Sequence, residues 1–383
     1  MKLLAVVQRY GAEVVGGSEG HARVMVERLA RRHEIEVATT TALDYWTWAE
    51  HYRAGDDAVG GVPVRRFPIA SGRDPQFKAV ERHVLFEEHT LADELDWPRR
   101  QGPHSPALLQ FLHQKGQSYD AVLFWTYIYE PTALGLPIVP ERAVLISTAH
   151  DELPLGLAPY RRLMALPRAF GFLTPEERDL VHGRFRNAHI PNVVLGIGLD
   201  PVPEADGERL RRQLAVRGPL VLYLGQVSEG KGCDELLQAW TARTTLLDAT
   251  LAFAGTVRME LPVRDDIVAL GRVSEAEKWE ALAAADVLVL PSHLESLGIV
   301  LLEAWQQGTP VLVPASNAVT AGQVARSGGG AAYETVEDLV PELEALLARG
   351  PMPGEAGREW VGRECDWQAV DARLEALVGL ASV

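Results

Sequence analysis

The sequence predicts an α/β protein with two domains, each built on a mainly parallel β-sheet. Its 383 residues are too many for one ordinary domain and suit two. In both halves of the chain, short β-branched segments alternate with amphipathic helical segments, which is typical of parallel strands joined by helices. Hydrophobic residues make up 47% of the chain and charged residues 23%, the balance of a globular protein.

The first half is predicted to form five strands, with one well-marked helix between the first two. Helical spacing of apolar residues runs from about Gly20 to Arg32, with Val24 and Leu29 on the buried face. Residues 42–118 are less regular and rich in Trp, His and Arg, which indicates a variable, exposed insertion. The predicted strands are Leu3–Val7, Ile35–Thr40, Ala121–Phe124, Val144–Ser147 and Gly171–Leu173.

The second half repeats the alternation more regularly. Its predicted strands are Leu220–Leu224, Thr250–Ala254, Ile267–Leu270, Val287–Leu290 and Pro310–Val313. Its predicted helices lie near Cys233–Thr241, Glu275–Ala285 and Ile299–Gln307. Both halves therefore predict a Rossmann-like sheet, and the two domains are expected to face each other across a cleft.

A Pro-Asn pair and two glycines interrupt the pattern at Pro191–Asp200, so the domains are predicted as residues 1–193 and 194–383. A last helix, about Trp367 to Leu380, follows a Pro- and Gly-rich stretch at Gly350–Gly357. Whether this helix crosses back to the N-terminal domain is left open. The apolar start of the chain lacks the features of a signal peptide, and a cytoplasmic protein is expected.

The net charge of −15 argues against nucleic acid as a partner. Residues 1–190 carry 22 basic and 24 acidic side chains, whereas residues 191–383 carry 15 and 28. The Arg-rich first half is compatible with an acidic acceptor or at most peripheral membrane contact, and equally with ordinary surface charge. The two cysteines, Cys233 and Cys365, form no metal-ligand pattern and suit a reducing compartment.

The segment Pro291–Pro314 places two glutamates around the start of a predicted helix. Ligands of open α/β sheets bind beyond the carboxyl ends of strands, and free N–H groups at a helix start suit a phosphate or sugar oxygen. Glu295 precedes the helix and Glu303 lies within it. Each carboxylate can accept two hydroxyl hydrogen bonds, so the pair could hold a ribose and a hexose. An isolated pair would more simply be surface and helix-terminal charges.

A second segment, Gly225–Gly232, follows the first strand of the C-terminal half. A lysine in a glycine-rich turn after a strand is a candidate phosphate contact, and Lys231 has this place. The pattern resembles the start of a P-loop. However, Gly232 stands where Ser or Thr would bind Mg²⁺, which argues against an ATPase.

Four features of the N-terminal half are weaker candidates. Gly16 and Gly17 precede the first helix and allow close approach of a backbone to a ligand. His150 follows a predicted strand, where it could donate a hydrogen bond to a phosphate or hydroxyl, and Asp151 could orient it or meet an acceptor. Glu130 and the aromatic side chain of Trp46 are further acceptor-side candidates, the latter by stacking on sugar rings.

These motifs resemble those of the retaining glycosyltransferases of family 4, which have the two-lobed GT-B fold. The family hallmark is two glutamates separated by seven residues within a longer Pro-Ser to Gly-x-Pro-Val string. Leu297 stands where Phe is commoner, and Gln226 replaces the Arg that usually accompanies the lysine. The residues that match the string are Pro291, Ser292, Glu295, Gly298, Glu303, Ala304, Gly308, Pro310 and Val311.

The resemblance implies roles for the candidate residues. Glu295 would contact the hydroxyls of the donor sugar, Glu303 the nucleotide ribose, and Lys231 the donor diphosphate. His150, Glu295 and Lys231 would be the catalytic residues. The donor would be bound by the C-terminal domain and the acceptor by the N-terminal one, with Asp151, Glu130 and Trp46 on the acceptor side. The implied donor-binding set is Gly16, Gly17, Gln226, Lys231, Arg272, Glu295, Ser296, Leu297, Gly298, Ile299 and Glu303.

The expected activity is transfer of a sugar from a nucleoside diphosphate sugar to a carbohydrate, lipid-linked or small-molecule acceptor, with retention implied by the family. A nucleotide-sugar epimerase of the same fold and a non-catalytic sugar-nucleotide binder remain alternatives, the latter because of Gln226. No cofactor is expected beyond the donor as co-substrate. No metal is expected either, because the chain contains no Asp-x-Asp motif and no Cys/His cluster.

Overall fold

The computed structural model describes residues 1–14 and 16–381, which form two compact units. Unit 1 comprises Met1–Ile197 and Val370–Val383, and unit 2 comprises Gly198–Ala369. The first division lies inside the segment predicted for the break. The predicted domain boundary differs at the other end, because most of the last helix belongs to unit 1 and not to the C-terminal domain.

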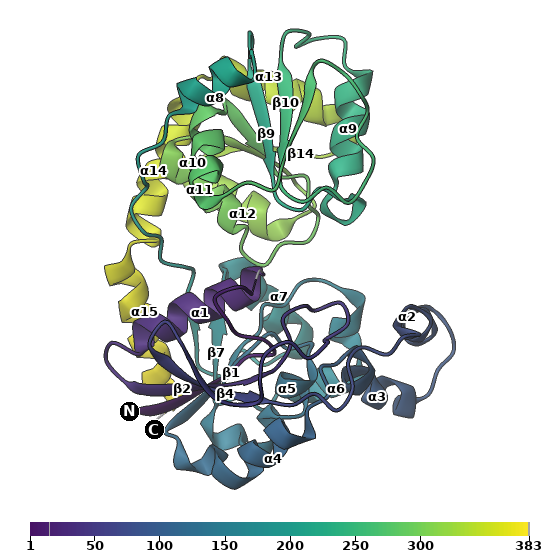
Figure 1. The fold of residues 1–383 in the computed structure, drawn as a ribbon, viewed down its shortest axis with the longest axis vertical. Coiled ribbons are helices and arrows are strands. Elements are labelled where there is room, and N and C mark those ends of the chain that lie inside the picture. The colour runs from purple at the N-terminus through teal and green to yellow at the C-terminus, as the bar shows by residue number, and fades with distance from the viewer. Residues whose placement is uncertain (15, 382–383) are drawn as a thin grey trace. The chain divides into compact units, whose positions relative to one another are not determined.

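Unit 1 contains an eight-stranded sheet with the order β3-β4-β2-β1-β5-β6-β7-β8 (Figure 1). All neighbouring strands are parallel except β3, which pairs antiparallel with β4 at the edge. The loops that follow β1, β2, β4 and β5 therefore leave from the same edge, here called the carboxyl edge. The strands are β1 (Lys2–Val6), β2 (Glu34–Thr40), β3 (Gly55–Val59), β4 (Val62–Phe67), β5 (Ala121–Trp125), β6 (Ala143–Ile146), β7 (Ala169–Phe172) and β8 (Asn192–Val194).

Helices cover both faces of this sheet. One face packs a large core in which Phe124 and Leu145 of the strands meet Trp97 and Leu112 of the helices. The helix predicted at Gly20–Arg32 begins three residues earlier, at Gly17. The helices of unit 1 are α1 (Gly17–Leu29), α2 (Phe77–Phe86), α3 (Leu91–Gln101), α4 (Pro106–Lys115), α5 (Glu130–Ala133), α6 (Ala158–Leu163), α7 (Pro175–Phe185) and most of α15 (Trp367–Ala381).

Residues 42–118 are more regular than the sequence predicts. They contribute the β3–β4 pair to the edge of the sheet, and the helices α2, α3 and α4 follow. The edge strand β3 is mostly exposed, with burial limited to its last residue, so it lacks the apolar run that marks the central strands. Strand β4 buries alternate residues, so its pattern is shorter and more polar than the continuous apolar runs of the predicted strands.

Unit 2 contains a six-stranded, fully parallel sheet with the order β11-β10-β9-β12-β13-β14, the Rossmann order. Helices α9 and α13 cover one face, and α10 and α11 the other (Figure 1). The strands are β9 (Leu220–Leu224), β10 (Thr250–Ala254), β11 (Ile267–Gly271), β12 (Val287–Val289), β13 (Val311–Pro314) and β14 (Gly330–Tyr333). The helices are α8 (Gly207–Gln213), α9 (Cys233–Ala242), α10 (Glu275–Ala284), α11 (Ile299–Gln307), α12 (Ala318–Ser327), α13 (Val336–Ala348) and α14 (Met352–Glu364).

The Pro- and Gly-rich stretch Gly350–Gly357 leads into helix α14, which begins at Met352. Its glycines serve packing: a Cβ on Gly354 would lie 1.8 Å from the carbonyl oxygen of Gly308, and one on Gly357 would lie 2.3 Å from the Trp305 ring. The absence of a Cβ at these two positions allows α14 to pack closely against α11. Pro353 is tolerated because it lies in the first helical turn.

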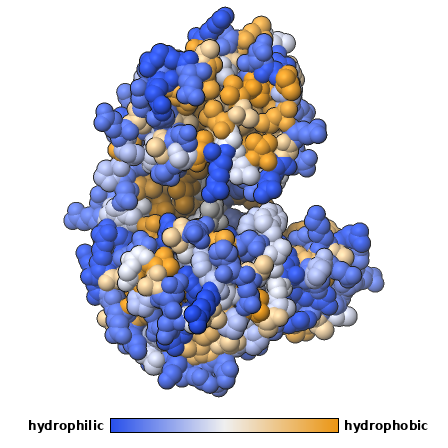
Figure 2. All heavy atoms as spheres, viewed as in Figure 1, coloured by the Kyte–Doolittle hydropathy of each residue, from blue (hydrophilic) through white to orange (hydrophobic). Residues whose placement is uncertain are grey.

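Within the part of the chain that the structure describes, no helix is long and apolar enough to cross a membrane. The visible surface of unit 1 is dominated by hydrophilic residues, and that of unit 2 shows a larger apolar area (Figure 2).

Candidate active site

The candidate donor site of unit 2 lies at the switch point of its sheet. Strands β9 and β12 are hydrogen-bonded neighbours, and the chain continues from them to opposite sides of the sheet. Ligands of open α/β sheets bind at such a point. The loop after β9 contains residues 225–232, and the loop after β12 contains residues 291–298. The two motifs that the sequence singles out are therefore adjacent in the fold.

A glycine allows the two loops to touch. Gly232 has φ of 70°, and a Cβ at this position would lie 2.4 Å from the carbonyl oxygen of Pro291. Any side chain at residue 232 would thus push the loops apart. The Gly in place of the P-loop hydroxyl is required by this backbone contact.

Lys231 and Glu295 form an ion pair across the two loops. The Lys231 Nζ lies 2.7 Å from Glu295 Oε1, and the side chains keep 40% and 23% of their exposure. Both groups therefore remain accessible to a ligand. A cation and a carboxylate thus lie side by side at the switch point, both open to solvent.

Glu303 makes a second such pair with Lys278 of α10, a residue that the sequence does not single out. The Lys278 Nζ lies 2.6 Å from Glu303 Oε1 and 2.6 Å from Glu275 Oε1. Burial raises the pKa of Glu303, and the nearby ammonium only partly offsets that rise. Burial lowers the pKa of Lys278, but the two carboxylates outweigh it and the pKa rises. Lys278 thus favours the ionised form of Glu303.

The start of α11 is free of a side-chain cap. Its N-cap residue is Gly298, which has φ of 66°, so the first backbone N–H groups of the helix have no side-chain acceptor. Ser296, Leu297 and Ile299 lie in the same turn, with Leu297 buried and the other two half-buried. Oxygen atoms of a ligand can accept hydrogen bonds from these N–H groups.

Three side chains that sequence reasoning missed hold this loop in place. Asn317 Nδ2 donates to the carbonyl of Ser292 at 2.9 Å, and Gln323 Nε2 donates to that of Leu297 at 2.6 Å. His293 bridges Ser316 Oγ, at 2.7 Å, and the carboxylate of Glu235, at 3.0 Å. Asn317 and Gln323 belong to the N-cap and the body of α12, and the Glu235 partner of His293 belongs to α9, so no local pattern could have revealed these contacts.

Gln226 and Arg272, the two remaining donor-side candidates of unit 2, are exposed. Gln226 follows β9, where its backbone carbonyl accepts a hydrogen bond from Tyr223 Oη at 2.8 Å. Arg272 follows β11 in the turn of Gly271, at the same edge of the sheet. Within the part of the chain that the structure describes, neither side chain forms a hydrogen bond or an ion pair, so the structure adds no role to the predicted ones.

In unit 1 the segment that holds Gly16 and Gly17 leads into α1 next to a buried charge network. Gly17 is exposed and begins the helix, and Gly16 is its N-cap without a side-chain hydrogen bond. Glu19 accepts hydrogen bonds from Arg9 Nε at 2.6 Å and Gln8 Nε2 at 2.9 Å. The helix start is thereby tied to the carboxyl end of β1.

The loop of His150 is held by the buried carboxylate of Glu177. Glu177 accepts hydrogen bonds from Ser147 Oγ at 2.5 Å, from the Ala149 N–H at 2.8 Å and from the Leu173 N–H at 2.7 Å. Burial raises the pKa of Glu177 to about 7, although these hydrogen bonds act against the rise. The structure thus places half-buried His150 at the carboxyl edge of unit 1, on a loop fixed from beneath.

The acceptor-side candidates are placed differently from one another. Glu130 is 1% exposed, and its carboxylate lies 2.9 Å from His104 Nδ1, so the structure places it beneath the surface, and its predicted contact with an acceptor stays a prediction. Asp151 is exposed and pairs with Arg184 at 2.9 Å. Trp46 is 56% exposed, which leaves its ring available for stacking.

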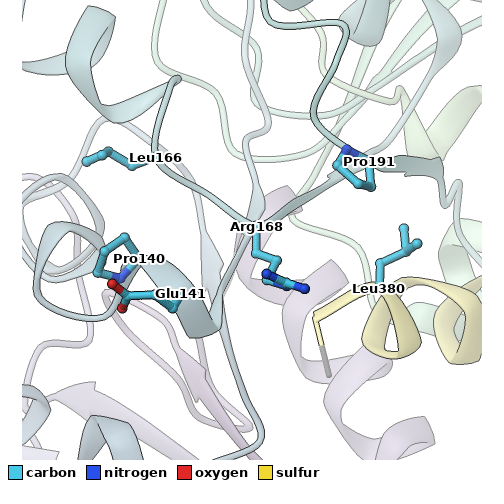
Figure 3. Close-up of a pocket in the computed structure, with 6 residues that line it drawn as sticks. All are labelled: Pro140, Glu141, Leu166, Arg168, Pro191 and Leu380. Atoms are coloured by element: carbon cyan, nitrogen blue, oxygen red, sulfur yellow. The ribbon is translucent and has the colours of Figure 1, made fainter. Parts of the chain in front are cut away.

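A hollow of about 400 Å³ lies elsewhere on unit 1, and Figure 3 shows the side chains around it. It borders the residues that precede β6, β7 and β8, at the edge opposite the carboxyl edge. The position argues against a role in catalysis. Its lining consists of Pro140, Glu141, Leu166, Arg168, Pro191 and Leu380.

The model of the family "Glycosyl transferases group 1" matches residues 206–358, which lie within unit 2. A GDP-mannose-dependent α-(1-6)-phosphatidylinositol monomannoside mannosyltransferase of Mycobacterium tuberculosis is 29% identical over 67% of this chain and 75% of its own. The Corynebacterium glutamicum mannosyltransferase for the monoacylated form of that acceptor is 28% identical over 82% and 93%.

Solved structures show the same fold along the whole chain. Sucrose-phosphate synthase from Thermosynechococcus elongatus superimposes with a TM-score of 0.70 at 16% identity, covering 98% of both chains. The Anabaena protein HepE in complex with UDP gives 0.70 at 14% identity, covering 99% of this chain and 100% of its own. The relatives are glycosyltransferases and lend no support to an epimerase. The protein therefore has the GT-B fold and is a nucleotide-sugar glycosyltransferase, and its unit 2 is similar to the group 1 family.

Proposed function

We propose that the protein transfers a hexose from a nucleoside diphosphate sugar held by unit 2, with Lys231 at the diphosphate, Glu295 at the sugar and Glu303 at the ribose. The observation that carries this proposal is the Lys231–Glu295 ion pair at the switch point of the sheet. GDP-mannose is the first donor to test, because the mannosyltransferases named above use it.

In the proposed reaction the bond between the anomeric carbon and the diphosphate oxygen breaks, and an acceptor hydroxyl oxygen bonds to the same carbon. The hydroxyl proton leaves with the nucleoside diphosphate. Lys231 and the N–H groups at the start of α11 stabilise the negative charge on the departing diphosphate. Retention of configuration rests on the resemblance to family 4.

Donor binding then requires an exchange of partners. Lys231 already satisfies its charge with Glu295, so phosphate oxygens must replace a carboxylate oxygen that lies 2.7 Å away. Glu295, once released, can accept hydrogen bonds from the hydroxyls of the sugar. The proposal thus predicts that nucleotide and sugar parts of the donor act on opposite partners of one ion pair.

Peripheral membrane contact through unit 1 is a further part of the proposal. Three large apolar side chains, Phe86, Leu91 and Leu95, are exposed by 69%, 60% and 54% where α2 meets α3. Apolar side chains of this kind can enter the interfacial region of a bilayer. Co-sedimentation with vesicles containing anionic phospholipid should fall when all three are changed to Ser, and unchanged sedimentation would rule this contact out.

A donor panel tests the function. The full-length protein is incubated with GDP-mannose, UDP-glucose and related nucleotide sugars, with and without candidate acceptors, and free nucleoside diphosphate is measured. Release that depends on an acceptor supports transfer, and NMR of the new glycosidic linkage shows whether configuration is retained. Tight donor binding without release would favour the non-catalytic binder suggested by Gln226.

A further inference from the structure

Three loops at the carboxyl edge of unit 1 bring two unused polar side chains together. Strands β4, β2, β1 and β5 are parallel neighbours in that order, so the loops that follow them emerge beside one another. Tyr45 follows β2, Arg73 follows β4 and Tyr129 follows β5. None of the donor-side roles uses Arg73 or Tyr129.

Arg73 is a half-buried cation without a contacting anion. Its backbone N–H donates to the carbonyl of Thr47 at 3.1 Å, and its guanidinium carbon lies 5.2 Å from the centre of the Phe77 ring. Its Nε is buried without a hydrogen-bond acceptor. Over residues 1–14 and 16–381, no carboxylate comes within ion-pair distance of it. The half-buried Arg73 differs in this from the buried Arg66, whose Nε lies 2.7 Å from Asp57 Oδ2.

The pKa of Arg73 reflects its burial and several neighbouring groups. Burial lowers its pKa, and Tyr129, Tyr45, Glu81 and Asp44 act in the opposite direction from beyond contact distance. The Asp44 carboxylate already accepts hydrogen bonds from Thr47 and from the backbone N–H of Trp46. Leaving a partly desolvated guanidinium unpaired is costly, and an incoming anion removes that cost.

Tyr129 offers a second donor beside this cation. Its ring packs edge-on against Trp48 with 5.0 Å between centroids, and Trp48 is fixed by a hydrogen bond from Nε1 to the Gln101 carbonyl at 2.8 Å. Burial raises the pKa of the Tyr129 hydroxyl and Glu19 adds to the rise, whereas Arg73 and Arg9 act to lower it. Among the described residues the Tyr129 hydroxyl has no hydrogen-bond partner. A rigid ring thus presents a phenol O–H near an unpaired guanidinium.

We propose that Arg73 and Tyr129 bind an anionic group of the acceptor, either a phosphate or a carboxylate. This inference rests on the proposed function only in placing the acceptor on unit 1. A guanidinium can donate two parallel hydrogen bonds to either anion, and the phenol can donate a third. The acceptor would then be a sugar, polyol or lipid headgroup that carries a negative charge near the hydroxyl to be glycosylated.

Anion binding can be measured without knowing the acceptor. The full-length protein is saturated with the nucleoside diphosphate of its preferred donor, which occupies the donor site, and is titrated calorimetrically with inorganic phosphate and, separately, with acetate. Phosphate or acetate should bind the unaltered protein, and Arg73→Gln should weaken binding roughly 10- to 100-fold, as expected for lost charge-assisted hydrogen bonds. Arg73→Lys should retain part of the affinity.

Matched controls separate this site from general charge. Lys78→Gln removes an exposed cation of the neighbouring helix α2 and should leave anion binding unchanged. Arg73→Gln should keep the nucleotide affinity of unit 2 and the thermal unfolding midpoint. Equal anion binding by Arg73→Gln and the unaltered protein, or no binding by either, overturns the proposal.

Transfer assays then connect the site to the acceptor. Matched pairs such as glucose and glucose 6-phosphate, or glucose and glucuronic acid, distinguish phosphate from carboxylate. Arg73→Gln should lower kcat/KM only for charged acceptors, while acceptor-independent hydrolysis of the donor is unaffected. Equal losses for neutral and charged acceptors would overturn the inference. Failure of every donor to release nucleoside diphosphate would contradict the proposed function instead, and the anion titration would still decide the site.

Discussion

In unit 2 each candidate donor carboxylate contacts a lysine, whereas in the described part of unit 1 the guanidinium of Arg73 contacts no carboxylate. A ligand of unit 2 must therefore displace an ion pair, and a ligand of unit 1 completes one. Displacement makes binding selective, because only a ligand that satisfies both partners recovers the lost interaction. The two carboxyl edges thus suit different ligands: a donor with a diphosphate and hydroxyls, and an acceptor with a negative charge.

The largest expected effect comes from Glu295. Glu295→Gln should lower kcat by about 10²-fold or more, because a contact at the reacting sugar acts on the transition state. Affinity for the nucleoside diphosphate alone should hold or rise, because Lys231 loses its internal partner. Steady-state kinetics and calorimetry measure the two quantities.

Glu229→Gln is the matched control, since Glu229 is exposed in the same loop as Lys231. A kcat for Glu295→Gln equal to that of the control would break the assignment of this site to the donor sugar.

Lys231 should dominate diphosphate binding. Lys231→Ala removes the only basic side chain of the loop 225–232 and should weaken nucleoside diphosphate binding roughly 10- to 100-fold, the loss of a charge-assisted hydrogen bond. Gln226→Arg, at the exposed position after β9, should tighten the same equilibrium. Calorimetry decides, and a much weaker Gln226→Arg complex would mean that the clamp is arranged for another group.

The variant Glu177→Gln tests whether the stability of unit 1 depends on this one buried carboxylate. Its folded-state pKa of about 7 exceeds its ordinary value of 4.5, so its contribution to stability is present below pH 4.5 and is lost as the pH rises through 7. The shift corresponds to about 3 kcal/mol at most. Glu177→Gln should destabilise the protein by ~1–3 kcal/mol, because an amide N–H₂ faces backbone donors, and should abolish this pH dependence.

Urea unfolding at pH 5.5, 6.5 and 7.5 measures both effects. Because the chain has two units, the transition of unit 1 should be followed separately, for example through its tryptophans Trp48, Trp97 and Trp125. The same pH slope in Glu177→Gln and the unaltered protein would assign the titration to another group.

Lys278 is predicted to position Glu303 for the ribose. Lys278→Met removes the ammonium that keeps this carboxylate ionised, so binding of a nucleoside diphosphate should weaken by up to about tenfold, and more at pH 6 than at pH 8. The preference for a ribonucleotide over its 2′-deoxy analogue should shrink in parallel. Lys278→Arg should preserve both. The preference for the ribonucleotide could instead be unchanged in Lys278→Met and reduced in Glu303→Gln. That result would assign Glu303 to the ribose and would show that Lys278 does not position it.

The sequence predicted the strands of unit 2 well, because central parallel strands are continuous apolar runs, as in Leu220–Leu224. It missed β14, whose residues Gly330–Tyr333 include no β-branched side chain, and the exposed edge strand β3. The GT-B fold and the transferase activity predicted from the resemblance are confirmed by the comparisons.

The site was predictable only in part. Glu295 and Lys231 could be placed on loops at strand ends, since loop position follows from the strand pattern. Their contact with each other joins residues 64 positions apart, and the pair of Lys278 and Glu303 joins residues 25 positions apart. Such contacts depend on sheet order and helix packing, which local patterns do not encode. Their importance for donor binding stays a prediction.

The smallest expected effect is that of metal removal. The other main class of glycosyltransferases holds a divalent ion through an Asp-x-Asp pair, and this chain has none. Among the described residues, no group of three or more His, Cys, Asp or Glu side chains could hold a metal. We therefore expect the charge of the leaving diphosphate to be stabilised by Lys231 and the uncapped start of α11, both fixed before reaction.

Excess EDTA should leave the rate of transfer within about twofold, the range that screening of the free nucleotide by Mg²⁺ can explain. The assay needs dialysed protein and donor, with activity followed as release of nucleoside diphosphate. Glu295→Gln, measured in parallel, gives the residual rate of a protein whose donor site has lost a proposed sugar contact. Complete loss of activity in EDTA, restored by one particular metal, would show that the diphosphate charge is neutralised by an ion. The contrast between the two units would then need revision, because the paired lysines of unit 2 would no longer be the cations that receive the donor.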